Sequence, residues 1–200
     1  MPDGSGRVTP DELMDFRRWA LTDLALNINR GRFAEWLVGK ALGVMAPDSY
    51  QIGWASYDLD YGDYKIEVKS SARGQSWRQS RPSAVSWGIA PSRWRWDPHP
   101  DEPGEGSWAR LDPPQRVADA YVFCCYEPYP LPYGPEGLDE RNSDVINLEN
   151  WWFWVASRET LHEYFGTNKS VTRRQIEAVA TAMRWSGIRT AVDAALASAP

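Results

Sequence analysis

Apolar and polar positions alternate with a period of two over residues 57–71, which read YDLDYGDYKIEVKSS. Gly62-Asp63 divides this stretch, and a glycine at the first central position of a two-residue turn predicts a type II′ β-hairpin. The turn sets a register in which Asp60 faces Lys65 and Asp58 faces Glu67. Because strand side chains alternate between two faces, this register separates an apolar from a charged face without exception. The apolar face holds Tyr57, Leu59, Tyr61, Tyr64, Ile66 and Val68, and the charged face holds Asp58, Asp60, Lys65, Glu67 and Lys69.

Helical spacing of apolar residues predicts helices before and after this hairpin. Thr9 is the expected N-cap of the first, with Glu12 closing a capping box, and Thr172 with Gln175 opens another. Continuous or alternating apolar runs predict further strands, of which the run ADAYVFCCY is expected in the middle of the sheet. The first two predicted helices are 10–28, which Asn29-Arg30-Gly31 ends, and 32–42, which Gly43 ends. The later helices are a short one from Arg158, 172–185 and 188–197. The further strands are 84–89, 118–126 and 151–156.

These elements predict one domain over residues 1–200, of the α/β class, with a central mixed β-sheet flanked by helices. Proline-rich stretches at 97–114 and 127–142 are predicted surface loops, and residues 1–8 are expected to be loose. Most of the twelve tryptophans are expected in the core. Cys124 and Cys125 are adjacent in a strand, so their thiols should lie on opposite faces, and neither a disulfide nor a zinc site is expected. Since no run of 18 apolar residues or signal-peptide region is found, a soluble, cytoplasmic protein without a membrane partner is expected.

The charged face of the hairpin contains a conflict between two acids. Asp58 and Glu67 would lie directly opposite each other, with Cβ atoms roughly 4.5–5.5 Å apart, and like charges there are destabilising. Lys69 lies two residues along the same face, whereas Asp60 already has Lys65 as a partner. A divalent cation with oxygen ligands would remove the repulsion, and Mg²⁺ commonly takes one or two carboxylates. A solvated acidic face that protects a sheet edge is the alternative interpretation.

An Asp, a turn and then a strand reading Ile66-Glu67-Val68-Lys69 resemble the PD-(D/E)xK nuclease superfamily, which has a restriction-endonuclease-like core. The resemblance covers residues 31–71 and is only architectural beyond them, and Tyr57 stands where the superfamily's name has proline. It implies a Mg²⁺-dependent endonuclease, with Mn²⁺ as a substitute and DNA as substrate. Asp58, Glu67 and the main-chain carbonyl of Val68 would hold the metal, and Lys69 would act on the attacking water. Glu35, in the second predicted helix, matches a helix glutamate that many members add, and the resemblance implies a metal- or water-binding role for it; a solvated surface role is its alternative.

A tract that follows the hairpin favours a nucleic-acid partner despite the net charge of −5. Residues 70–96 contain five arginines and no acid, so a phosphate backbone could run there. Within it, Gln75 matches a glutamine that some relatives carry near the metal, and Trp77 could stack on a base or be buried. Arg93-Trp94-Arg95-Trp96 suits either base stacking or a strand with its tryptophans inward. The expected nucleic-acid contacts are Arg73, Gln75, Trp77, Arg78, Arg93 and Arg95.

The leading hypothesis is therefore metal-dependent hydrolysis of phosphodiester bonds, with DNA as the expected substrate. A homodimer is a further expectation, because many such nucleases cut two strands as dimers. Two other classes stay open. One is a nucleic-acid-binding or scaffold protein with the same fold and no catalysis, which would bind in the presence of a chelator. The other is a tryptophan-rich protein-interaction module, which would show no metal dependence.

Overall fold

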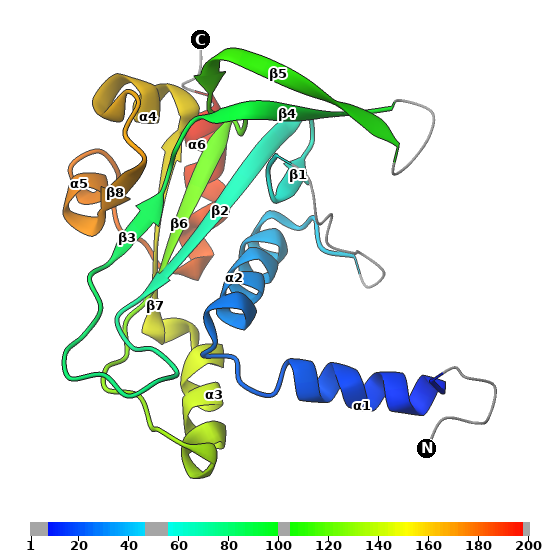
Figure 1. The fold of residues 1–200 in the computed structure, drawn as a ribbon. Coiled ribbons are helices and arrows are strands. Elements are labelled where there is room, and N and C mark those ends of the chain that lie inside the picture. Colours follow the sequence, from blue (N-terminus) through cyan, green and yellow to red (C-terminus); the bar gives the residue numbers. More distant parts are fainter. Residues whose placement is uncertain (1–7, 47–55, 100–104, 198–200) are drawn as a thin grey trace.

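The computed structural model describes residues 8–46, 56–99 and 105–197, and its centre is a four-stranded mixed β-sheet (Figure 1). The strand order is β1-β2-β6-β7; β2 and β6 run parallel, and the two outer pairs are antiparallel. The class predicted from the sequence, α/β with a mixed sheet flanked by helices, is confirmed at this level. The strands are β1 (Leu59–Tyr61), β2 (Tyr64–Ala72), β6 (Ala120–Tyr126) and β7 (Trp151–Ser157).

The predicted hairpin is formed by β1 and β2. Leu59 pairs with Ile66, Asp60 with Lys65, and Tyr61 with Tyr64, as the turn required. Gly62 has a φ of +60°, whereas no described non-glycine residue, Asp63 included, has a positive φ, which is the pattern of a type II′ turn. The Lys65 ammonium lies 2.6 Å from Asp60 Oδ1. The local sequence therefore determined this register correctly.

The ladder of this hairpin ends at the pair Leu59–Ile66, two pairs earlier than predicted. Asp58 donates its N–H to the carbonyl of Ile66 at 3.0 Å, and Ile66 is the residue already paired with Leu59. The predicted pairs Asp58–Glu67 and Tyr57–Val68 are consequently absent from the ladder of described residues. The reason is that the Asp58 carboxylate, through Oδ2, accepts the N–H of Val68 at 2.7 Å and so takes the place of a strand partner.

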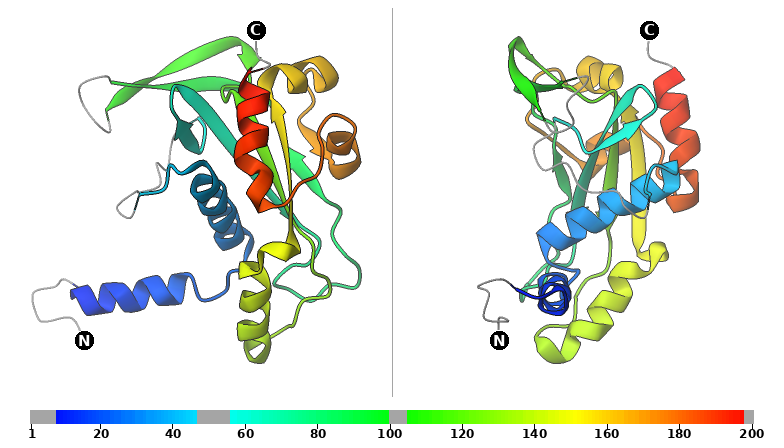
Figure 2. Two further views of the ribbon diagram at one scale, coloured as in Figure 1. Left: turned by 180° about the vertical axis from the view of Figure 1, so that it is seen from behind. Right: turned by 90° about the vertical axis from the view of Figure 1, so that its right-hand side faces the viewer.

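Two separate cores pack on the two faces of the sheet (Figure 2). Helices α2 (Asn27–Leu42) and α6 (Ile188–Ala197) cover one face, where Ile66, Val68 and Cys124 are buried. On the other face lie α4 (Arg158–Phe165), α5 (Arg173–Glu177) and a small sheet of β3 (Ser86–Gly88) and β8 (Ser170–Thr172), over Tyr121 and Cys125. The two free thiols thus lie on opposite faces, as predicted.

The N-terminal helices differ from the prediction in their boundaries. Helix α1 spans Pro10–Ala20 with the predicted Thr9 capping box, but it does not continue to residue 28. Asn29-Arg30-Gly31, predicted as a break, lies inside α2. The Asn29 amide donates to the carbonyls of Ala20 and Asp23, and Arg30 donates to the carbonyl of Ala25. These polar residues are buried because they bind the backbone of the intervening turn, which residue-by-residue polarity does not indicate.

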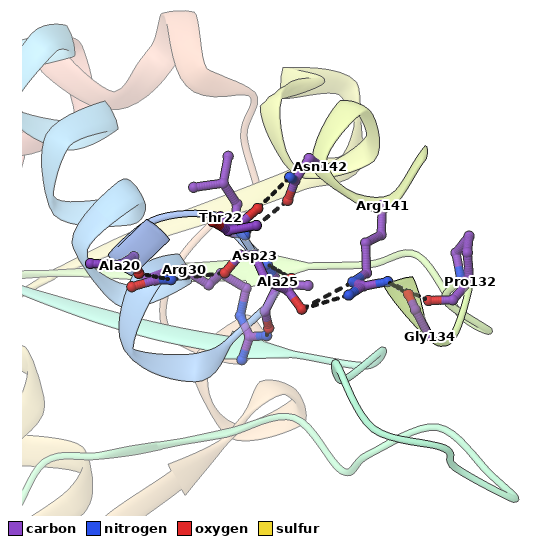
Figure 3. A network of polar contacts seen from close by, with 11 residues as sticks. Ala20, Thr22, Asp23, Ala25, Arg30, Pro132, Gly134, Arg141 and Asn142 are labelled. Atoms are coloured by element: carbon purple, nitrogen blue, oxygen red, sulfur yellow. Dashed lines mark hydrogen bonds and ion pairs between the residues drawn. The ribbon is translucent and has the colours of Figure 1, made fainter. Parts of the chain in front are cut away.

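A polar network joins that turn to a helix that the sequence analysis did not predict (Figure 3). Helix α3 (Leu138–Ile146) follows the short 3₁₀ helix η1 (Pro135–Gly137), so the predicted loop 127–142 is wrong for residues 138–142. Buried Arg141 donates two hydrogen bonds to Asp23, at 3.1 and 2.8 Å, and one to the carbonyl of Gly134. Arg141 therefore ties Gly134, within the predicted loop, to Asp23 in the turn before α2. The prolines of this segment do not indicate such a contact.

The largest error concerns residues 97–114, which were predicted as a surface loop. Strands β4 (Ser92–Pro98) and β5 (Gly106–Gln115) pair antiparallel and form a two-stranded ribbon outside the main sheet. In a two-stranded ribbon each strand has an unpaired edge, so prolines are tolerated there. Arg93 to Trp96 do form a strand, but its tryptophans are not both inward, because Trp94 is 50% exposed.

Near the C-terminus the predicted strand 151–156 and the helices starting at Arg158 and Ile188 are confirmed. The Thr172 capping box also forms, but α5 ends at Glu177 rather than near Trp185. The chain then leaves the helix because Met183 exchanges backbone hydrogen bonds with Phe153 of β7, at 3.0 and 2.9 Å. Two 3₁₀ helices complete the described elements, η2 (Leu148–Asn150) and η3 (Trp185–Gly187).

The tryptophans are less buried than predicted. Trp87, Trp151 and Trp154 lie in the two cores, but Trp19, Trp36, Trp77, Trp94 and Trp108 are exposed. Trp19 belongs to α1, which projects away from the sheet in Figure 1 and in the left view of Figure 2 and has no buried residue between Pro10 and Ala20. No helix in the described ranges is long and apolar enough to cross a membrane.

Candidate functional site

The end of β1 exposes an edge of β2, and Asp58 lies at this edge. In a strand, the N–H and C=O of one residue point the same way and successive residues alternate. The Ile66 carbonyl accepts from Asp58, while the Lys65 carbonyl accepts from Asp119 next to β6. The Val68 carbonyl must then point toward Asp58, on the same side as its N–H. A carboxylate and a main-chain oxygen therefore meet where β1 ends.

Glu67 and Lys69 point to the face of β2 opposite α2. They alternate with Ile66 and Val68, which are buried under α2. Their neighbour on that face is Tyr121, because Glu67 pairs with it across the parallel β2–β6 ladder. The side chain of Glu67 is only 15% exposed, and its Oε1 accepts a hydrogen bond from the Lys69 ammonium. Lys69 thus already provides the positive charge next to this buried carboxylate.

Asp58 and Glu67 disfavour each other's charge although they are not a ladder pair. Burial raises the pKa of Asp58, while the Val68 N–H and the charge of Lys69 lower it. For Glu67, burial and then the charge of Asp58 raise the pKa, and Lys69 lowers it less. Both carboxyl groups therefore hold a proton more tightly than ordinary acids do, even with a lysine beside them. Two acids in this condition form a site that a further cation would stabilise.

Glu67 and Lys69 border a cavity of about 280 Å³ on this face of the sheet. Tyr121 and Arg116 line it, and the sequence analysis singled out neither. Burial and then the charge of Glu67 raise the pKa of Tyr121, while Arg116 is held by the carbonyls of Ile89 and Asn168. Only the register between β2 and β6, which are far apart in the chain, brings Tyr121 next to Glu67. The cavity is also lined by Ser56, Gly88, Ser92 and Gln115.

Glu35, the fourth predicted catalytic residue, approaches from the other face of the sheet. After burial and Cys125, the charges of Asp58 and Glu35 both raise the pKa of Cys124, whose thiol lies under α2. Glu35 is therefore within electrostatic reach of the same thiol as Asp58. Within residues 8–46, 56–99 and 105–197, no three His, Cys, Asp or Glu side chains are grouped as a metal site.

The donor set at the edge of β2 nevertheless suits a hard cation. Mg²⁺ typically takes one or two carboxylates and completes its shell with water and phosphate oxygens. Asp58 accepts a hydrogen bond only at Oδ2 in the described part of the chain, so Oδ1 is open to another ligand. The Val68 carbonyl and Glu67 are the other oxygen donors predicted from the sequence. To bind a cation there, Glu67 must release Lys69.

The residues predicted to contact nucleic acid lie in two places, the loop after β2 and strand β4, and one of them, Gln75, has a structural role. Arg73, Trp77 and Arg78 line a concave surface formed by residues 73–84, together with Arg81 and with no acidic residue among them. Trp77 is 53% exposed, which agrees with the stacking alternative rather than with burial. Counted along β2, Arg73 lies roughly 20 Å from Glu67. Arg78 stacks its guanidinium over Tyr133 at 5.5 Å.

Gln75 has a structural role in this loop. It is buried, donates to the carbonyl of Ala72 and to Ser83 Oγ at 3.2 Å, and accepts from Arg30 at 3.5 Å. Its side chain therefore fixes the loop after β2. Arg93 and Arg95 lie on β4, where Arg93 is exposed and Arg95 is paired with Asp97 at 2.6 Å.

A comparison with protein-family models gives no match, and a search of curated proteins finds none that resembles the chain. The assignment of a function therefore depends on the geometry of the site alone.

Proposed function

We propose that the protein is a metal-dependent nuclease that hydrolyses phosphodiester bonds in nucleic acid, with DNA as the expected substrate. The observation that carries this proposal is the pair of partly buried carboxyl groups, Asp58 and Glu67, whose pKa values stay raised although Lys69 lies beside them. A stabilising role would be better served by neutral side chains at these positions. Glu67 and Lys69 also border a cavity, through which a substrate can reach them.

The fold proposed for this activity is the restriction-endonuclease-like core. It is supported by a helix that precedes the hairpin, an acid at the end of β1, and Glu67-Val68-Lys69 on the adjacent strand of a mixed sheet. Asp58, Glu67 and the Val68 carbonyl would hold Mg²⁺, for which Mn²⁺ would substitute. A bound divalent cation lowers the pKa of a coordinated water and neutralises charge on the scissile phosphate.

The chain's own residues would do the remaining work. The Lys69 ammonium, which lies beside Glu67, would donate a hydrogen bond to the attacking water or to a phosphate oxygen. Arg73 and Arg78 would bind phosphates of the backbone, and such contacts position a substrate without reading its sequence. Glu35, on the opposite face, would hold a water in a supporting position. A homodimer that cuts both strands is part of the same proposal.

The test is a cleavage assay with supercoiled plasmid, linear duplex, single-stranded DNA and RNA, each with Mg²⁺, Mn²⁺ or chelator. Wild type should cut in the presence of metal, and Asp58→Asn and Glu67→Gln should each be inactive. Asp23→Asn is the matched control, since the Asp23 side chain is 15% exposed, like that of Glu67, and is paired with Arg141 outside the site. Equal cleavage by wild type and Glu67→Gln would assign the activity to a contaminant and overturn the proposal.

One observation favours a second candidate, a nucleic-acid-binding protein without catalysis. The Lys69–Glu67 ion pair already compensates one of the two acids, so the site is partly neutralised without metal. In that case the protein would bind nucleic acid in chelator and cut none of the substrates in any metal. The same assay, run beside a binding measurement, separates the two candidates.

A further inference from the structure

The ribbon of β4 and β5 extends from the sheet next to the candidate site (Figures 1 and 2). Its cross-strand pairs are Trp94 with Arg110, Trp96 with Trp108, and Pro98 with Gly106, alternating with Arg95–Ala109 and Asp97–Ser107. Because side chains alternate, Trp94, Trp96, Trp108 and Arg110 form a first set on one face of the ribbon, and Arg95, Asp97, Ser107 and Ala109 lie on the other. We call the first set the aromatic face of the ribbon.

The aromatic face carries three indoles and one cation, and its paired positions include no carboxylate. Trp94 is 50% exposed and Trp108 is 48% exposed, while Arg110 is also exposed. The opposite face is neutralised internally, since Arg95 pairs with Asp97. Arg110, which the sequence analysis did not single out, is thus the arginine that lies among the indoles.

Part of this face has a structural explanation. Trp96 and Trp108 contact each other across the strands with ring centroids 5.4 Å apart, and such pairs stabilise a hairpin that is marginal alone. Gly106 permits this contact, because a Cβ there would lie 2.5 Å from the Trp96 ring. Hairpin stability does not explain the exposure of Trp94, whose partner across the ribbon is Arg110.

The base of the ribbon reaches the cavity that Glu67 borders. Ser92 and Gln115, which pair at the base of the ribbon, line that cavity together with Glu67 and Lys69. Trp96 donates its backbone N–H at 2.9 Å to the hydroxyl of Ser56, which also lines the cavity. A strand lying along the ribbon would therefore lead to Glu67.

We propose that the aromatic face binds an unpaired stretch of nucleic acid, with bases stacked on Trp94 and Trp108 and a phosphate at Arg110. Stacking requires the flat faces of bases, which are accessible in single strands and covered in a duplex. A ribbon that read a duplex would instead present side chains that hydrogen-bond to base edges, and the paired positions of this face offer only Arg110. That the bound strand is then cut rests on the proposed function; the binding does not.

The experiment measures binding in chelator, where cleavage does not occur. Fluorescence anisotropy would be followed for a labelled 20-nucleotide DNA strand, the same RNA strand, and the corresponding DNA duplex, at one fixed salt concentration. Wild type should bind a single strand more tightly than the duplex. Trp94→Ala and Trp108→Ala should each weaken single-strand binding about 5- to 150-fold, the range expected for one stacked base, and the DNA and RNA arms show which strand is preferred.

Matched controls separate stacking from a general loss of folding. Trp19→Ala removes an indole that is 74% exposed on α1, far from the ribbon in sequence, and should leave binding unchanged. Trp94→Phe and Trp108→Tyr keep an aromatic ring and should restore most of the affinity. Arg110→Ala should weaken binding and reduce its salt dependence, whereas Arg95→Ala, on the opposite face, should not.

Equal affinity of wild type for single strand and duplex would overturn the inference, as would unchanged binding by Trp94→Ala or an equal loss with Trp19→Ala. Its failure is distinguishable from failure of the proposed function. If wild type cuts nothing in any metal but Trp94→Ala loses single-strand binding, the nuclease fails and the aromatic face stands. If wild type cuts and Trp94→Ala binds and cuts single strands normally, the reverse holds.

Discussion

Replacing Glu67 by glutamine should stabilise the metal-free protein at neutral pH. Burial and Asp58 raise the pKa of Glu67 even with the Lys69 ammonium in contact, so its surroundings as a whole disfavour the charge. Ordinary values are 3.8 for Asp58 and 4.5 for Glu67. Since both folded values are higher, the contribution of these groups to stability is complete below the ordinary values and is lost as the pH rises through the raised ones. Wild type should therefore lose stability from pH 4 toward 7, and Glu67→Gln should lose less.

Adding a divalent cation should reverse the order of the two proteins. A ligand that binds only the folded state at 100 times its Kd adds about 2.7 kcal/mol. For a chain of this length, about 1 kcal/mol moves Tm by about 2–4 °C, so wild type should gain roughly 5–10 °C. Glu67→Gln lacks one of the two carboxylates at the edge of β2 and should gain little.

The assay is thermal unfolding followed by circular dichroism at pH 5, 6.5 and 8, first in chelator and then with Mn²⁺. Glu127→Gln is a control for which the opposite change in stability is expected, because Glu127 is paired with Arg173. It should lower the free energy of unfolding by about 0.2–1 kcal/mol and respond to Mn²⁺ as wild type does. The reasoning is refuted if Glu67→Gln is less stable than wild type at pH 8 in chelator, or if both proteins gain equally from the metal.

Three other substitutions test separate parts of the structure. Lys69→Ala should bind Mn²⁺ several-fold more tightly by calorimetry, because a competing cation is removed, and yet lose cleavage; weaker metal binding would contradict this. Gly106→Ala should displace the Trp96 ring, which would lie 2.5 Å from the new Cβ, and a changed near-ultraviolet dichroism with an unchanged far-ultraviolet spectrum checks it. Arg30→Met should lower the free energy of unfolding in urea by about 1–3 kcal/mol, since the carbonyl of Ala25 and the amide oxygen of Gln75 lose a buried donor. Burial already lowers the pKa of Arg30 to about 10. An unchanged unfolding midpoint would show that the donor is dispensable.

Elements whose signal lies within about ten residues could be predicted from the sequence. The β1–β2 register follows from one turn, and the capping boxes at Thr9 and Thr172 follow from two residues each. Elements defined by a distant partner could not be predicted. Helix α5 stops at Glu177 because the next segment pairs with Phe153 of β7, and β5 exists because β4 lies opposite it.

The same distinction applies to the candidate site. Asp58, Glu67 and Lys69 could be singled out because they share one hairpin and alternation separates them from the apolar side chains. Tyr121 reaches Glu67 only through a parallel ladder between strands separated by about fifty residues of chain, so no local pattern points to it. Gln75 illustrates the opposite error, since proximity in sequence suggested a contact with the substrate and the side chain is buried against Arg30.

The shortness of β1 is what makes a site at this edge possible. If the ladder continued in register, Val68 would give both its N–H and its carbonyl to a strand partner, and Asp58 would be an ordinary paired residue. Because the ladder ends at Leu59, the Asp58 side chain takes the N–H of Val68 instead, and the carbonyl of Val68 is directed at the same carboxylate. The two partly buried acids, whose charges are disfavoured, therefore lie where the main-chain oxygen of Val68 has no hydrogen-bond partner in β1. Any substitution that extends β1 past Leu59 should remove metal binding and raise stability in chelator together, because both properties come from this one interruption of the ladder.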